Sequence, residues 1–169
     1  MLKQTIRLIS RIPAISTLVR FSLKIGWACS RIWSHLRFRA LVPKAGDSVC
    51  HWSVEIKYPE NLNVGDIVSI GPLCSIGARS PITLGDYVRI SRGVVIETAG
   101  LDRETELPFH HLSKPIVIEK GAWIGTHAII LGGVTIGQNA IIGAGTVITK
   151  DVPAGAIVVG ASSRYLEAK

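Results

Sequence analysis

The sequence predicts an all-β fold: a parallel β-helix of about four to five coils, preceded by an α-helical segment and interrupted by a protruding loop. The main evidence for this fold is a period of six residues, because isoleucine occupies positions 118, 124, 130, 136, 142 and 148. A helix repeats near 3.6 residues and a strand at 2, so neither explains this period. Short strands joined by tight turns do, since three such units close one coil of ~18 residues around inward aliphatic side chains.

Two earlier blocks repeat the pattern and define the other coils. Aliphatic residues six apart run from Val64 to Ile76 and again from Leu84 to Ile96. The predicted coils cover residues 64–81, 84–101, 118–135 and 136–153, with a degenerate coil at 46–63. Two extra residues before Leu84 predict a wider turn near residues 79–81.

The turns are predicted from the third residue after each aliphatic marker. The types found there tolerate a positive φ. They are Gly121, His127, Gly133, Asn139, Gly145 and Asp151. The residue after each turn position is mostly small, and we expect it to point inward at the corner.

The segment TAGLDRETELPFHHLSK, residues 98–114, lacks the repeat and is polar. We therefore expect residues 97–115 to leave the column as a protruding loop. Loops fixed on a rigid scaffold are where functional residues concentrate.

The first 40 residues carry eight Lys/Arg and no Asp or Glu, whereas the remaining residues are close to neutral. No uncharged run there approaches the ~20 residues of a membrane span, and arginines interrupt any signal-peptide core. From residue 15, apolar positions follow a helical stripe. A basic, tryptophan-bearing amphipathic helix favours contact with an anionic membrane surface. Capping of the column, binding of a partner and an organellar transit peptide are alternatives.

Three segments are therefore expected: a basic amphipathic helical segment (1–45), the β-helix (46–160) and a C-terminal tail (161–169). The three cysteines, at positions 29, 50 and 74, form no C-x-x-C pair, which favours a reducing, cytoplasmic compartment over a disulfide framework or a zinc site. Nucleic-acid binding is disfavoured, because the positive charge is concentrated on an amphipathic helix without a known reader motif.

The stretch GAWIGTHAIILGGVTIGQNAIIGAGTVITKDVPAGAIVVG, residues 121–160, resembles the hexapeptide-repeat acyltransferases, and most closely their galactoside, maltose and exopolysaccharide O-acetyltransferases. The close match covers about residues 114–164, and the first 45 residues do not match that branch. The resemblance implies a left-handed β-helix, a homotrimer, acetyl-CoA as co-substrate without a metal, and an active site in the groove between two columns.

The resemblance also implies cofactor-binding residues. Trp123 matches the tryptophan beside the pantetheine arm, and Thr126 matches a position whose backbone N–H faces the thioester. Ala144, Thr149 and Lys150 match CoA-contacting positions of the last coil, and Arg164 matches a basic residue that reaches the CoA phosphates. The chain departs from the family at GASSR, residues 160–164, where a proline before the arginine is usual.

A second departure concerns the catalytic base. The sugar acetyltransferases place a histidine 24 residues before the tryptophan, and that position is Ala99 here. His111 and His110 in the protruding loop are the preferred replacements, because a histidine within reach of the acceptor hydroxyl can remove its proton during direct attack in a ternary complex. Asp102, Glu104 or Glu106 could orient the imidazole. His127 and Glu97 are alternatives, and His35 and His51 are expected to be structural.

The expected function is transfer of acetyl from acetyl-CoA to a sugar hydroxyl of a surface glycan or its lipid-linked precursor, by an enzyme at the inner face of the cell membrane. Alternatives are a serine or amino-sugar acetyltransferase and a non-catalytic β-helix scaffold. A γ-class carbonic anhydrase shares the fold, but the five histidines lack its H-x₄-H spacing.

Overall fold

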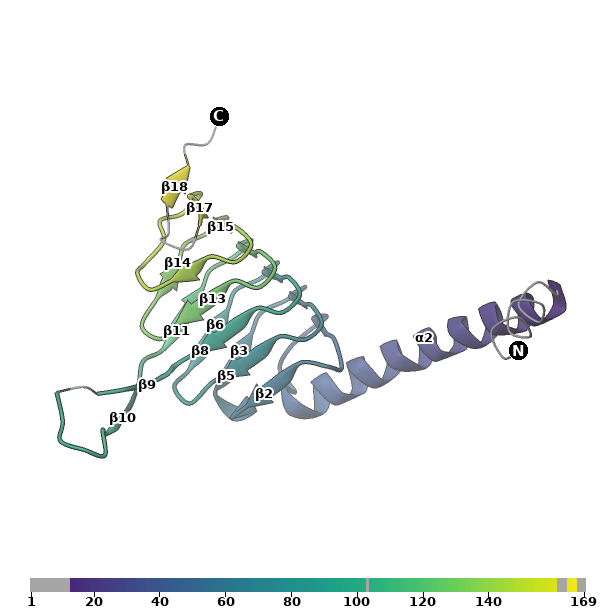
Figure 1. Cartoon of the computed structure of the whole chain (residues 1–169), viewed down its shortest axis with the longest axis horizontal. Helices are drawn as coiled ribbons and strands as arrows, with labels where there is room; N and C mark the ends of the chain where they lie inside the picture. Colours follow the sequence, from purple (N-terminus) through teal and green to yellow (C-terminus); the bar gives the residue numbers. More distant parts are fainter. Residues whose placement is uncertain (1–12, 103, 161–163, 167–169) are drawn as a thin grey trace, which may run out of the picture.

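A computed structural model describes residues 13–102 and 104–160, together with the backbone of residues 164–166. It shows a three-sided column of short strands with one long helix at its N-terminal end (Figure 1). The helix is α2 (Pro13–Leu41). The column is a parallel β-helix, as the six-residue period predicts, and it is left-handed, as the family resemblance implies.

Each side of the column is one sheet, built from one strand per coil. Sheet A contains β1 (Val49–Cys50), β4 (Ser69–Ile70), β7 (Arg89–Ile90), β12 (Trp123–Ile124), β15 (Ile141–Ile142), β17 (Ile157–Val159) and the antiparallel β18 (Arg164–Leu166). Sheet B contains β2 (Glu55–Lys57), β5 (Ser75–Gly77), β8 (Val95–Glu97), β13 (Ile129–Leu131) and β16 (Val147–Ile148). Sheet C contains β3 (Leu62–Val64), β6 (Ile82–Leu84), β11 (Ile116–Ile118) and β14 (Thr135–Ile136), and the 3₁₀ helix η1 (Pro59–Asn61) precedes it.

The predicted aliphatic markers form the core and stack in register. In sheet B, Ile76 pairs with Ile96, Ile96 with Ile130, and Ile130 with Ile148. These four side chains are at most 1% exposed. Burying one such side chain contributes about 1.5–3 kcal/mol. The stacked rows of buried aliphatic markers are therefore the main source of the column's stability.

The turns agree with the prediction at five of its six positions. Gly121, His127, Gly133, Asn139 and Gly145 have a positive φ, but Asp151 does not, and Gly155 forms the next left-handed turn. At Asp151 the prediction is wrong: the backbone keeps a negative φ there, and the carboxylate accepts a hydrogen bond from the N–H of Thr135 (2.7 Å) on the preceding coil.

Earlier turns adopt the left-handed conformation with residues that disfavour it. Tyr58, Ile67, Leu73 and Tyr87 have φ values of 58–61°. A Cβ at such a φ costs roughly 1–2 kcal/mol. The ladder above and below each turn therefore imposes the conformation on residues that do not prefer it.

The predicted protruding loop is a hairpin of β9 (Ala99–Leu101) and β10 (His111–Ser113), which leaves the column between sheets B and C (Figure 1). Buried Thr98 anchors its base. The Thr98 hydroxyl donates to the Gly77 carbonyl (2.7 Å) and accepts from the Ser80 N–H (3.1 Å). The hairpin thus begins at a rigid point of the third coil.

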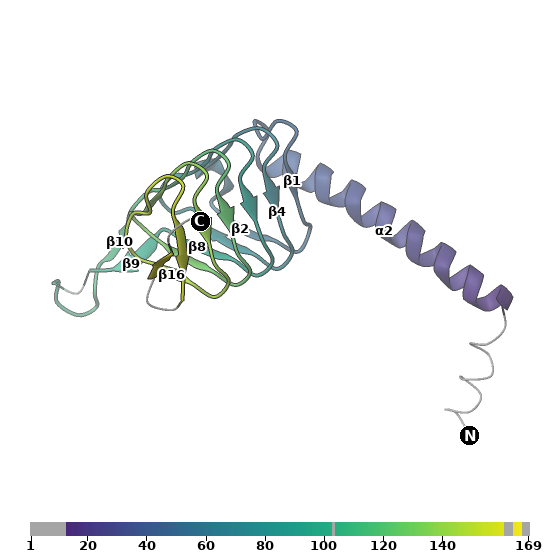
Figure 2. The same cartoon turned by 90° about the horizontal axis from the view of Figure 1, so that it is seen from above.

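Only the last turns of α2 pack on the column. Phe38 is buried, the Arg37 guanidinium donates to the Val54 carbonyl (3.0 Å), and the Ser34 hydroxyl accepts from the Trp52 N–H (3.0 Å). The rest of α2 projects away from the column (Figures 1 and 2). The capping alternative therefore holds for the C-terminal turns of the helix only. The sequence also predicts a shorter apolar stripe before Pro13, at Leu2, Ile6 and Ile9, which lies outside the described residues.

Candidate active site

Trp123 lies on the outer face of sheet A, where its side chain is 51% exposed. Its indole Nε1–H donates to the Ser91 hydroxyl (3.1 Å). Arg89 and Ile141 flank it in register on the neighbouring strands. The indole is thereby held in one orientation with much of its ring open to a ligand.

Thr126 and Ala144 occupy equivalent exposed positions of successive coils, at the corner that follows sheet A. The Gly145 N–H donates to the Thr126 carbonyl (2.9 Å), which joins the two turns. Within the described part of the chain, no hydrogen bond engages the Thr126 N–H. A free backbone donor is what a developing oxyanion requires. We call the corner of Trp123, Thr126 and Ala144 the tryptophan edge.

His127 lies at the tryptophan edge as a turn residue. Its φ is 57°, and its N–H donates to the Arg92 carbonyl (3.0 Å). The imidazole covers Gly93 so closely that a Cβ at position 93 would collide with the ring. The ring therefore serves the packing of the turn, as expected of a histidine in a left-handed turn.

Thr149 and Lys150 lie at a different corner. They follow β16, so they lie where sheet B gives way to sheet C, and both are exposed. The hairpin leaves the same corner at β8, two strands earlier in sheet B. We call this corner the hairpin edge. Sheet B separates it from the tryptophan edge, so one chain does not bring the two groups of predicted residues together.

His110 and His111 are exposed on the hairpin. Their described hydrogen bonds are those of the backbone, in which Asp102 N–H donates to the His110 carbonyl (2.8 Å) and His110 N–H donates to the Thr105 hydroxyl (3.0 Å). Asp102 accepts from the Glu104 N–H (3.0 Å), which commits one of its carboxylate oxygens to the turn. Among the described residues, no carboxylate is hydrogen-bonded to either imidazole.

Arg164 begins β18, whose backbone pairs with β17 through Val159. Its side chain and residues 161–163 lie outside the described part of the chain. Its role therefore stays a prediction.

The two buried cysteines are not poised as nucleophiles. Desolvation raises the pKa of Cys50 to about 12 and also raises the pKa of Cys74. Both thiols are therefore neutral near pH 7, and a neutral thiol is a poor nucleophile. In the described ranges, no group of three or more His, Cys, Asp or Glu side chains gathers as metal ligands do.

Sequence reasoning missed Ser91 and Arg89, which support Trp123. The signal was available in the period, because Arg89 precedes the marker Ile90 just as Trp123 precedes Ile124. In sheet A, the residue before each marker points outward, and these residues form one row across the strands.

Two family models match the chain. Residues 115–150 match the bacterial transferase hexapeptide (six repeats), and residues 67–98 match the hexapeptide repeat of succinyl-transferase. Both matched ranges fall within the coils, one on each side of the hairpin.

Curated relatives extend the similarity beyond the repeat. Nodulation protein L of Rhizobium leguminosarum bv. viciae is 38% identical over 87% of this chain and 78% of its own length. The same protein of Rhizobium meliloti strain 1021 is 46% identical over 63% of this chain, which spans 60% of it. Galactoside O-acetyltransferase of Escherichia coli strain K12 is 33% identical over 67% of this chain and 57% of its own length.

A solved structure matches nearly the whole chain. The hexapeptide-repeat acetyltransferase of Vibrio cholerae O1 biovar eltor, in complex with acetyl-CoA, aligns with a TM-score of 0.77 and 28% identity, over 94% of this chain and 91% of that one. The similarity therefore includes α2 as well as the column.

Proposed function

The chain belongs to the hexapeptide-repeat acetyltransferases, a family of acetyl-CoA-dependent acyltransferases, and from this premise we propose that it acetylates a sugar hydroxyl of a surface glycan or its lipid-linked precursor. The observation that carries the proposal is the tryptophan edge, with its ordered indole and its free backbone donor. The galactoside O-acetyltransferase among the relatives supports a sugar as the acceptor.

The chemistry follows from the residues at the two edges. The pantetheine arm lies along Trp123, and the Thr126 N–H donates to the thioester oxygen as it gains negative charge. An imidazole of the hairpin takes the proton of the acceptor hydroxyl while that oxygen bonds to the acetyl carbon. The C–S bond then breaks, and the proton passes to the departing CoA sulfur.

The separation of the edges supports a homotrimer. Side by side, two columns can set the hairpin edge of one against the tryptophan edge of the next, which completes a groove that a single column lacks. Three columns arranged this way close a ring in which each groove is the same. Thr149, Lys150 and Arg164 would then contact the nucleotide end of CoA, where basic side chains suit its phosphates.

The test of the function is release of CoA from acetyl-CoA, which we expect only when a glycan acceptor is present. Trp123→Ala should raise the KM for acetyl-CoA about tenfold, since an aromatic contact of this kind is worth about 1.4 kcal/mol. Thr83→Ala, an exposed change on sheet C, should leave KM unchanged. Failure of the wild-type chain to bind CoA would contradict the proposal and favour a scaffold protein.

We also propose that α2 holds the enzyme on the anionic inner face of the cell membrane. At 3.6 residues per turn, Leu18, Phe21, Ile25, Ile32 and Leu36 share one side of α2, and each is at least 49% exposed. Phe38 and Ser34, which contact the column, lie on the other side. The apolar stripe therefore faces away from the column.

Charge complements the apolar stripe. The helix carries five Lys/Arg and no carboxylate, and each cation near an anionic surface contributes about 1 kcal/mol. No helix among the described residues is long and apolar enough to cross a bilayer. The composition suits a helix lying in the membrane interface.

Vesicle flotation of the full chain tests this location. We expect it to float with vesicles containing phosphatidylglycerol more than with phosphatidylcholine alone. Ile25→Asp with Ile32→Asp should weaken binding at least about tenfold, because burying either side chain contributes more than 1.4 kcal/mol. Ser16→Asp with Thr17→Asp adds the same charge outside the apolar stripe and should weaken binding less. Equal losses, or equal binding to both vesicles, would contradict the proposal.

A further inference from the structure

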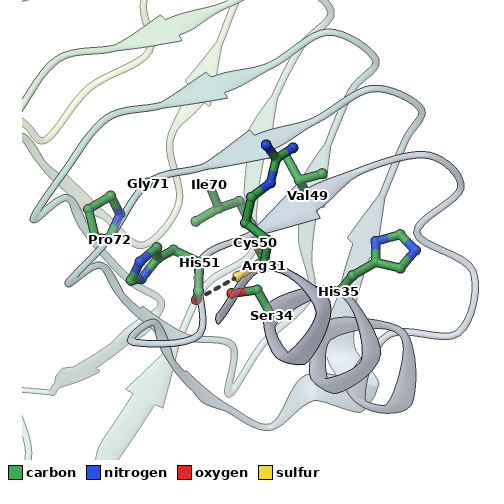
Figure 3. Close-up of a pocket in the computed structure, with 9 residues that line it drawn as sticks. All are labelled: Arg31, Ser34, His35, Val49, Cys50, His51, Ile70, Gly71 and Pro72. Carbon is green, nitrogen blue, oxygen red and sulfur yellow. Dashed lines mark hydrogen bonds between the residues drawn. The ribbon is translucent and has the colours of Figure 1, made fainter. Parts of the chain in front are cut away.

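A cavity of about 260 Å³ lies where α2 meets the first two coils. Figure 3 shows Arg31 and Ser34 extending from α2 and His51 and Pro72 on the side of the column, while the His35 ring points away from them at the margin of the cavity. The helix and the column are both needed to form it.

The polar lining of this cavity is suited to an anion. Arg31, His35 and His51 line it, and no carboxylate does. The Arg31 guanidinium carbon lies 4.7 Å from the centroid of the Trp27 ring, and within the described residues it has no carboxylate or hydrogen-bond partner. Arg31 extends across the first strand beside Val49 (Figure 3). A guanidinium whose N–H groups have no acceptor can bind phosphate or carboxylate through two parallel hydrogen bonds.

His51 adds a second donor on the opposite side of the cavity. Its Nδ1 is hydrogen-bonded to the Ser53 hydroxyl (2.8 Å), which leaves Nε2 for a ligand. The other walls are apolar, from Val49, Ile70 and Pro72, and suit the carbon face of a sugar ring. The combination selects an anionic group attached to a compact, partly apolar body.

The position of the cavity relates it to the tryptophan edge. Pro72 follows β4 and Thr126 follows β12, so both lie at the corner after sheet A, with β7 between their strands. Two strand spacings separate them, about 10 Å. That span exceeds one sugar ring and suits a sugar joined to a phosphate or to a second, acidic sugar.

We propose that this cavity binds the anionic group of the acceptor, a phosphate or a carboxylate, and so selects an acidic saccharide. That the bound sugar is the acetyl acceptor rests on the proposed function. The binding of an anionic sugar does not, because the site is complete without acetyl-CoA.

The experiment titrates the full chain with glucose 1-phosphate, glucuronic acid and glucose, without acetyl-CoA, and follows the imidazole ring resonances of His35 and His51 by NMR. We expect an anionic probe to shift these resonances and glucose not to. Arg31→Gln should weaken binding about tenfold, the loss of one charge-assisted contact. Lys24→Gln removes the same charge from α2 outside the cavity and should not weaken it.

The two anionic probes distinguish a phosphate from a carboxylate as the anionic group that the cavity binds. A response to glucose 1-phosphate alone supports a phosphate-linked acceptor, and a response to glucuronic acid alone supports an acidic sugar. Unchanged melting of Arg31→Gln shows that the variant is folded, and His51→Gln supplies an independent variant. Equal response to glucose, no response to either anion, or equal weakening by Lys24→Gln would overturn the proposal. Binding without acetyl transfer would keep this site and reject only its link to the proposed function.

Discussion

Replacing His110 and His111 together with alanine is expected to lower the acceptor-dependent kcat about 10²–10⁴-fold, the usual contribution of a general base. These two imidazoles are exposed, lie on the hairpin that leaves the column between sheets B and C, and are free of side-chain hydrogen bonds in the described structure. The KM for acetyl-CoA should change little, because Trp123 and Thr126 stay in place. Steady-state measurement of CoA release gives both constants, and the two single variants show which imidazole acts.

Glu104→Gln is the matched control on the hairpin. Among the described residues its carboxylate forms no hydrogen bond or ion pair with either imidazole, so kcat should stay within about twofold of wild type. Mixing the double histidine variant with Trp123→Ala supplies a second control. If each groove combines two chains, mixed oligomers contain intact grooves and recover activity at low acetyl-CoA. A double variant with wild-type kcat would reject both histidines as the general base and favour the alternatives Glu97 and His127.

Ile130→Ala is expected to lower the free energy of unfolding by about 2–5 kcal/mol. Ile130 is fully buried, and it lies between Ile96 and Ile148 in sheet B. The coils above and below are tied to it by ladder hydrogen bonds, so they cannot close over the lost side chain. Urea unfolding followed by circular dichroism measures the loss.

The adjacent Leu131 provides the control, because it belongs to the same strand but points outward and is 38% exposed. Leu131→Ala should cost about 1 kcal/mol or less, since it leaves no enclosed cavity. A loss at Leu131 as large as that at Ile130 would show that the strand, rather than the buried column, carries the stability.

The fold was predictable because one local rule is repeated. Each marker of the period, from Val64 to Ile148, is buried, and the six isoleucines of residues 118–148 distribute over the three sheets in turn. The left-handed turns at Ile67, Leu73 and Tyr87 were not predictable from residue type. There the stacked coils impose a φ that these side chains disfavour.

The candidate site was only partly predictable. The resemblance identified Trp123, Thr126 and Ala144, and the structure brings these three to one edge. Local sequence did not reveal that Thr149, Lys150 and the hairpin lie at another edge. The edge at which a turn lies depends on which of the three sheets the preceding strand joins. The cavity under α2 was hidden for a similar reason. Arg31 and His51 are 20 residues apart and meet only because the helix end packs on the first coil.

The order of coils along the column fixes how far Thr126 stands from the end of the column that carries α2. β1 lies next to the end of α2, and β12, which precedes Thr126, is the fourth strand of sheet A. Three strand spacings amount to about 15 Å. If α2 holds the enzyme on a membrane, as we propose, the enzyme is expected to prefer sugars about 15 Å from the lipid anchor of its acceptor over sugars further out.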